Sequence, residues 1–189
     1  MMRKRGSVPV KKRVYLGCEG DSEVAYGQLL NDFLNDAGIA IHLVPERLNP
    51  GAGDPQACVR KAIARIRHLN NMRSPSFTLA AVLIDHDRVQ DDAPREQSVQ
   101  ALAAKHAIHI IWQRPSHEAL LLRHLPNCAD RRPPTSNAAM KALQANWDGY
   151  RKPMTRQSLA LQIAFRDVVR AVSVEPELRA FLQAIRLVP

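Results

Sequence analysis

The sequence predicts an α/β fold, with a mostly parallel sheet of four strands flanked by helices and followed by a helical C-terminal extension. Two observations lead to this prediction. Over the first two thirds of the chain, short apolar runs of strand length alternate with amphipathic segments of helical length, which is typical of parallel sheets. The last third contains only helical patterns. With 189 residues, the chain is long enough for one domain with a substantial core.

Four apolar runs account for the predicted strands. The first contains Val14, Tyr15 and Leu16 in succession, and a near-continuous apolar run is expected of a strand that is buried on both faces. The third run, which ends in Val82-Leu83-Ile84, has the same character. The four strands are predicted over 12–18, 39–44, 77–84 and 108–112.

Capping residues mark several of the predicted helices. Asp21 or Ser22 is placed to cap the first helix, Gly38 to stop it, and Asp54 to cap the second. The caps at the helix starts follow from side-chain oxygens that can satisfy the free backbone N–H groups there. The helices are predicted over 23–35, 54–69, 94–105, 116–124, 137–146, 155–172 and 175–186.

The chain divides into three predicted regions. Residues 1–11 are expected to form a flexible basic arm, and residues 12–125 the α/β core, which includes a loop at 49–53. Residues 126–189 begin with a proline-rich polar loop and continue as helices that are expected to pack on the core.

Positive charge dominates the composition. The formal net charge is +9, and the first 13 residues hold six of the Lys and Arg side chains and no acid. Such a balance favours a polyanionic partner, with nucleic acid first, although a basic arm can also bind phosphates without specificity or simply maintain solubility.

The cysteine pattern and the hydropathy exclude several classes of protein. The three cysteines are scattered and form no CxxC pair, which argues against a zinc ribbon or a disulfide framework and fits a reducing cytosol. No apolar stretch approaches a membrane span, and none follows the basic N-terminus as it would in a signal peptide. A cytoplasmic protein is therefore expected.

Acidic residues follow three of the four predicted strands. Glu19 closes the first strand, and Asp85 and Asp87 close the third. Glu118 follows the fourth strand after a short turn. The carboxyl ends of parallel strands meet at the edge where such sheets bind ligands, and clustered carboxylates suit Mg²⁺ or Mn²⁺.

The pair Asp85 and Asp87 has a geometry suited to sharing one cation. Side chains two residues apart on an extended backbone point to the same side, so His86 between them would point away. The alternative is that Asp87 caps a turn and Asp85 is solvated. Likewise, Glu19 could serve only as an acid that stabilises the start of a helix.

The predicted helix after the fourth strand carries two histidines. His117 and His124 are seven residues apart and share a helix face, yet both could be ordinary surface residues. Their spacing does not match the HExxH zinc motif, so no zinc protease is predicted. Glu118 on the same helix is a candidate general base.

Two further groups are candidates for phosphate contacts. Gly20, beside Glu19, permits close approach of a phosphate to the backbone. Tyr150, Lys152 and Arg156 form a basic cluster with an aromatic residue, which could hold a nucleic-acid backbone. A solvated loop leading into the next helix explains the second group equally well.

These motifs together resemble a known family. Segments 14–20 and 82–87, a strand that ends in Glu and a strand that ends in DxD, resemble the TOPRIM fold of topoisomerases, primases and OLD-type nucleases. Segment 115–125 resembles the helix after strand four in RloB-like proteins, and Tyr150 with Lys152 matches a Tyr-x-Lys element downstream in that family. The resemblance covers most of residues 12–172.

The resemblance implies metal-dependent phosphodiester chemistry. Glu19 would be a metal ligand or general acid/base, and Asp85 and Asp87 would be metal ligands. Glu118 would be a further acid of the site, and Lys152 a phosphate contact. RloB-like proteins accompany restriction and abortive-infection systems, which implies a role in anti-phage defence and a possible companion defence protein.

The sequence thus predicts a Mg²⁺- or Mn²⁺-dependent nuclease, with RNA favoured slightly over DNA by analogy with toxins. The main alternative is a non-catalytic nucleic-acid-binding or regulatory protein on a TOPRIM scaffold. A receiver-type phosphoacceptor domain is a third interpretation. It needs a lysine after a later strand, where this chain has Gln113 and Arg114.

Overall fold

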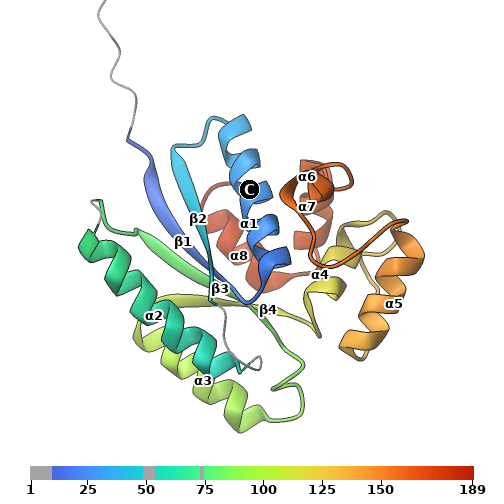
Figure 1. The fold of residues 1–189 in the computed structure, drawn as a ribbon, viewed down its shortest axis with the longest axis horizontal. Coiled ribbons are helices and arrows are strands. Elements are labelled where there is room, and N and C mark those ends of the chain that lie inside the picture. The colour runs from blue at the N-terminus through green and yellow to red at the C-terminus, as the bar shows by residue number, and fades with distance from the viewer. Residues whose placement is uncertain (1–9, 49–53, 73–74) are drawn as a thin grey trace, which may run out of the picture.

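A computed structural model describes residues 10–48, 54–72 and 75–189 of the chain (Figure 1). The arm predicted over residues 1–11 lies mostly outside these ranges, and the loop predicted at 49–53 lies entirely outside them. Within the described ranges, no helix is both long and apolar enough to cross a membrane.

The centre of the molecule is a four-stranded sheet in the order β2-β1-β3-β4, in which every neighbouring pair is parallel. The prediction of a parallel α/β sheet is confirmed, and the strands lie within a few residues of the predicted bounds. The strands are β1 (Lys12–Cys18), β2 (Ile41–Arg47), β3 (Leu79–Asp85) and β4 (Ile108–Gln113).

Alternate residues of the central strands point into two separate apolar layers, as the two-residue period of a strand requires. Leu16 and Leu83 belong to the layer beneath α1 (Asp21–Asp36), whereas Tyr15 and Val82 belong to the layer beneath α2 and α3. Burial on both faces explains why β3, and β1 from Val14 onward, are almost entirely apolar.

Helices cover both faces of the sheet (Figure 1). Asp54 caps α2 as predicted, because its carboxylate accepts from the backbone N–H groups of Gln56 and Ala57. The predicted cap of α1 is wrong, since that helix begins at Asp21 and Gly20 precedes it without a side-chain cap. The remaining helices before the C-terminal region are α2 (Pro55–Met72), α3 (Ala93–Lys105) and α4 (His117–His124).

The C-terminal region is helical, as predicted, and adds to the α1 side of the sheet. Helix α5 and helix α7 pack on α4, α6 packs on α1, and α8 packs on β4. Phe181 and Leu143 share an apolar layer with Leu16 of β1, so the extension and the sheet are joined by one core. These helices are α5 (Ser136–Asn146), α6 (Arg156–Ala160), α7 (Phe165–Val172) and α8 (Pro176–Ala184).

The single helix predicted over 155–172 is wrong, because the chain forms α6 and α7 there with a break between them. Asp167 causes the restart: its carboxylate accepts from the backbone N–H of Ala164, 2.9 Å away, as an acid in the first turn of a new helix does. The break turns Ile163 into the core, where it is 1% exposed, and leaves Leu161 exposed.

Candidate functional site

Two of the predicted acids meet at the carboxyl end of the sheet. Glu19 follows β1 and Asp85 ends β3, and these two strands are neighbours in the sheet. The Oε2 atom of Glu19 accepts a hydrogen bond from the backbone N–H of Asp85 at 3.3 Å. The sheet therefore brings the two carboxylates to the same point, as the position of each acid at a strand end predicted.

Asp85 is held from one side by a helix start. Its Oδ1 atom accepts from the backbone N–H of His117, at the first turn of α4, at 2.8 Å. Burial raises the pKa of Asp85 well above its ordinary value, and the nearby carboxylates of Glu23, Glu19 and Glu118 raise it further. Negative charge is thus crowded around Asp85, as in sites that bind cations.

A polar cavity of about 370 Å³ opens at this edge of the sheet. Glu19, Glu23 and Asp85 contribute carboxylates to it, and Lys152 contributes an ammonium group. The complete lining consists of Glu19, Gly20, Asp21, Ser22, Glu23, Asp85, Lys152 and Pro153.

Glu23 is a site residue that sequence reasoning missed. It lies in the first turn of α1 and is only 6% exposed. A Cβ atom at Gly20 would come within 3.0 Å of the Glu23 Oε2 atom, so the carboxylate lies against the glycine backbone. The helical spacing in the sequence could have revealed that Glu23 is buried, because Glu23 shares the inward face of α1 with Gly27 and Leu30.

Glu118 lies beside the cavity in a nearly closed environment, with its side chain 2% exposed. It accepts hydrogen bonds from Ser116 Oγ at 2.8 Å and Tyr150 Oη at 3.3 Å, and it forms an ion pair with Lys152. Burial alone would raise the pKa of Glu118, but the hydrogen bond and charge of Lys152 outweigh burial and lower it. Glu118 is therefore ionised and fixes the position of the ammonium group.

Lys152 is the cation of the site. Burial would lower the pKa of Lys152, but the hydrogen bond and charge of Glu118 raise it, so the group stays protonated. Its charge also acts to lower the pKa of Asp85 and of Glu19. The ammonium group thus partly neutralises a cluster of carboxylates that would otherwise repel one another.

The other members of the predicted basic cluster do not line the cavity. Tyr150 is buried, and its hydroxyl group is directed to Glu118, so the ring presents no surface to a nucleic acid. Arg156 is exposed and pairs with Asp32 at 2.6 Å. The structure places Lys152 in the cavity and Arg156 outside its lining.

Asp87 does not line the cavity. The strand ends at Asp85, so the extended backbone on which the shared-cation prediction rests does not reach Asp87. Instead, the Oδ2 atom of Asp87 accepts from Ser136 Oγ at 2.8 Å at the surface. The charge of Asp87 still contributes to the raised pKa of Glu19, after burial and the charge of Glu23. His86 packs against Trp112 on the α3 side of the sheet, away from Asp85.

His117 and His124 are both buried, so the interpretation as surface residues is wrong. Their rings contact Tyr26 edge to face, which confirms that the two histidines share a helix face. His124 bonds Tyr26 Oη at 3.1 Å and the carbonyl of Leu120 at 2.9 Å. Burial lowers the pKa of His124 to about 4, so it is a neutral core residue.

The oxygen donors of the cavity fit a hard divalent cation in their chemistry, because Glu19, Glu23 and Asp85 offer carboxylates and no sulfur or imidazole. Within the described ranges, however, no three His, Cys, Asp or Glu side chains already converge as a metal-binding group.

Comparison with known proteins identifies the chain at the level of a family. A family model described as RloB-like protein matches residues 14–183, a range that includes the acidic cavity and all of the sheet except the first two residues of β1. No curated protein and no solved structure gives a significant match. Because the match spans most of the sequence, as the motifs at the strand ends predicted, the chain belongs to the RloB-like protein family.

Proposed function

We propose that this protein is a metal-dependent nuclease built on a TOPRIM scaffold. The observation that carries the proposal is the acidic cavity at the carboxyl end of the parallel sheet, in which Glu19, Glu23 and Asp85 face the ammonium group of Lys152. Ligands of open α/β sheets bind at this edge. Crowded carboxylates next to a fixed positive charge suit a site for a divalent cation and a phosphodiester.

Glu19, Glu23 and Asp85 would hold Mg²⁺ or Mn²⁺, and Asp87 would lie at the rim of the site. When bound, the cation supplies polarisation of the phosphodiester and activation of water. The raised pKa of Asp85 supports this assignment, because it results first from burial and then from repulsion by the neighbouring carboxylates, and a bound cation would offset both.

The remaining residues have positioning roles in this proposal. Lys152, held by the ionised carboxylate of Glu118, would contact a non-bridging phosphate oxygen. The backbone N–H of His117 fixes the orientation of Asp85, and Gly20 leaves space for the Glu23 carboxylate. Together these contacts preorganise the charges before substrate arrives.

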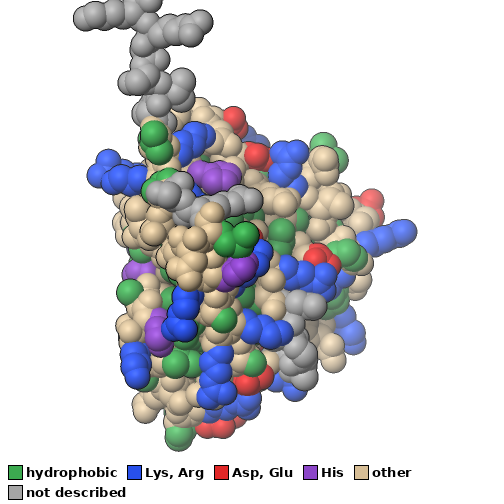
Figure 2. Space-filling view, turned by 60° about the vertical axis from the view of Figure 1, so that its left-hand side comes forward, with side chains coloured by type: hydrophobic (Ala, Val, Ile, Leu, Met, Phe, Trp, Pro, Cys, Tyr) green, Lys and Arg blue, Asp and Glu red, His purple; other side chains and the backbone are tan. Residues whose placement is uncertain are grey.

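The substrate is nucleic acid in this proposal, with RNA favoured. The net charge of +9 supports a polyanionic substrate. Lys and Arg side chains also outnumber Asp and Glu on the face drawn in Figure 2. Membership of the RloB-like family extends the proposal to anti-phage defence in the cytoplasm, where a companion defence protein could take part.

The test is cleavage of tRNA, single-stranded RNA and plasmid DNA in Mn²⁺, Mg²⁺ or EDTA. We expect metal-dependent cutting by the wild type and its loss in Asp85→Asn. Asp36→Asn is the matched control, because it removes an exposed carboxylate at the far end of α1. If the wild type cleaves none of the three substrates in either metal, the nuclease function is contradicted.

A non-catalytic nucleic-acid-binding or regulatory function is the second candidate. It is favoured by the ion pair of Lys152 with Glu118, which already neutralises part of the acidic cluster without a metal. Gel-shift binding that is the same in Mn²⁺ and EDTA, and unchanged in Asp85→Asn, would support this function. A loss of binding in EDTA would exclude it.

A further inference from the structure

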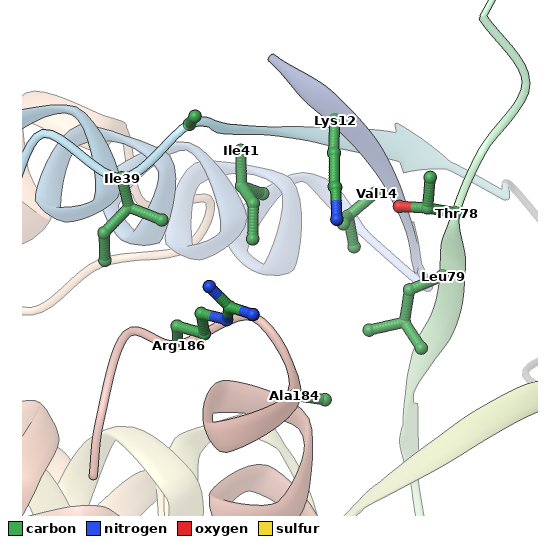
Figure 3. Close-up of a pocket in the computed structure, with 9 residues that line it drawn as sticks. Lys12, Val14, Ile39, Ile41, Thr78, Leu79, Ala184 and Arg186 are labelled. Carbon is green, nitrogen blue, oxygen red and sulfur yellow. The ribbon is translucent and has the colours of Figure 1, made fainter.

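A second cavity lies at the opposite end of the sheet from the acidic site. It has a volume of about 320 Å³ and opens where β1, β2 and β3 begin, against the end of α8 (Figure 3). The strands of seven residues separate the two sites by roughly 20 Å, at about 3.3 Å per residue. The two cavities share no lining residue.

Two cations converge on this second cavity. In Figure 3, the Lys12 side chain extends into it from β1, and the guanidinium group of Arg186 extends into it from the segment after α8. Within the described part of the chain, neither side chain has a hydrogen-bond or ion-pair partner. None of the described lining residues is acidic. The two positive charges are therefore not neutralised from within the cavity.

The backbone at Arg186 carries a conformational cost. Its φ angle is +61°, in the left-handed region that glycine adopts most readily. The backbone N–H of Arg186 donates to the carbonyl of Gln183, and that of Leu187 donates to the carbonyl of Leu182. This pattern ends many helices, and glycine is the usual residue at the left-handed position. Stability alone would favour glycine at this position, so the strained backbone makes Arg186 a candidate functional residue.

The chain carries further positive charge next to Lys12. Lys11 precedes it and Arg13 follows it in the sequence. Nearby, His42 has a lowered pKa, first because of burial and then because of the charges of Lys11 and Arg13. The electrostatic potential at this end of the sheet is therefore positive.

The walls of the cavity are aliphatic. Val14, Ile41 and Leu79 line it from the three strand starts, and Ile39 lines it from the turn before β2. No aromatic ring is among the described lining residues, so the cavity lacks the stacking surface that binds nucleobases. Its volume is at the lower end of the range for small-molecule sites.

We propose that this cavity is a binding site for a small aliphatic organic anion. The carboxylate or phosphate head would bind between Lys12 and Arg186, whose guanidinium group can take either head in a bidentate contact. The aliphatic body would pack on Val14, Ile41 and Leu79. This site is independent of the acidic cavity and of the proposed nuclease function.

The test is calorimetric titration of the full chain with four probes: octanoate, hexyl phosphate, AMP and inorganic phosphate. Octanoate and hexyl phosphate distinguish the two head groups, AMP replaces the aliphatic body by a nucleoside, and inorganic phosphate lacks a body. We expect at least one aliphatic anion to bind more tightly than AMP and inorganic phosphate, because only it contacts the apolar walls.

Two variants and one control locate the binding. Lys12→Gln and Arg186→Gly are each expected to weaken binding about tenfold by removing a charge-assisted contact. Arg186→Gly also relieves the left-handed strain, so its melting temperature should not fall, which separates lost binding from misfolding. Lys11→Gln is the control, since Lys11 directly precedes Lys12 in the chain but bonds Asn35 outside the cavity.

Several outcomes would overturn the proposal. One is the absence of binding of either aliphatic anion at about 10 mM, which is far weaker than specific binding requires. Another is an affinity in Lys12→Gln and Arg186→Gly that equals that of the wild type. An equal loss in Lys11→Gln would indicate non-specific charge attraction. Tighter binding of AMP would assign the cavity to nucleotides instead of aliphatic anions.

Discussion

The ammonium group of Lys152 forms an ion pair with the Glu118 carboxylate, which is 2% exposed, and both lie beside Asp85. Lys152 comes from the segment after α5, whereas Glu118 is in the first turn of α4. The C-terminal extension thus supplies the positive charge of a site whose carboxylates come from the sheet and from helices α1 and α4. Several consequences of this arrangement can be measured.

Replacement of Lys152 by methionine should destabilise the protein. Glu118 would keep its bonds to Ser116 and Tyr150 but lose its ion-pair partner, and a buried charge without its partner costs about 1–3 kcal/mol. Urea unfolding at pH 7 measures the difference. Lys152→Arg, which keeps the charge, should lose less than Lys152→Met, and equal stability of all three proteins would contradict the role of the pair.

The effect of Lys152→Met should depend on pH. The pKa of Glu118 in the folded protein is lowered because Lys152 outweighs the effect of burial. A carboxyl group of this kind stabilises the fold above its unfolded pKa of 4.5, and the stabilisation is lost as the pH falls through the lower folded pKa. The stability difference between wild type and Lys152→Met should therefore be largest near pH 7 and shrink below pH 4.5.

Asp85→Asn should stabilise the protein in EDTA. The pKa of Asp85 is raised by burial and then by the neighbouring carboxylates, so its ionisation destabilises the fold increasingly as the pH rises from 3.8 through the folded pKa. Asparagine removes this cost and can still accept from the His117 N–H. We expect a melting temperature several degrees higher at pH 8 and no gain below pH 3.8. A lower melting temperature at pH 8 would contradict this account.

The sheet was predictable because its signals are local. Apolar runs such as Val14–Leu16 and the acids at their ends are readable from the sequence, and parallel pairing brings Glu19 and Asp85 together. The positions of the side chains around these two acids were harder to predict from the sequence. Asp87 was assigned by extending the strand alternation past Asp85, whereas the strand ends there and Asp87 bonds Ser136.

Contacts between distant segments account for the other differences. Tyr150 was expected at a nucleic-acid surface, but its position depends on Glu118, 32 residues earlier, which no local pattern reveals. Glu23 was overlooked because an acid in a first helical turn is common and stabilises the helix dipole. Its burial results from the packing of α1 against the 150–154 segment, where Ser22 accepts from the N–H of Met154.

Gly20→Ala tests the placement of Glu23. The backbone at Gly20 is extended, with φ −136°, so alanine causes no backbone strain, yet its Cβ would lie 3.0 Å from Glu23 Oε2. The carboxylate should be displaced, with a stability change within about 1 kcal/mol. We expect nuclease activity to fall at least tenfold, as about 1.4 kcal/mol of misplacement would cause. Unchanged activity would remove Glu23 from the site.

Metal binding without catalysis distinguishes the two possible ligand sets, one with Asp87 as the sequence predicts and one with Glu23 as the cavity suggests. Thermal unfolding in increasing Mn²⁺ reports binding directly, because a ligand at 100 times its dissociation constant stabilises by about 2.7 kcal/mol. If Glu19, Glu23 and Asp85 hold the cation, Glu23→Gln should abolish most of the Mn²⁺-dependent shift. Asp87→Asn should retain most of it, since Asp87 bonds Ser136 at the surface.

The reverse result, a shift lost in Asp87→Asn and kept in Glu23→Gln, would restore the paired-aspartate site and require the 86–87 turn to rearrange on metal binding. Asp36→Asn should behave as the wild type in the same titration, because it lies at the opposite end of α1 from the cavity. A Mn²⁺ shift that is equal in all four proteins would place the cation outside the acidic cavity. In that case the carboxylates around Asp85 would serve only to hold Lys152.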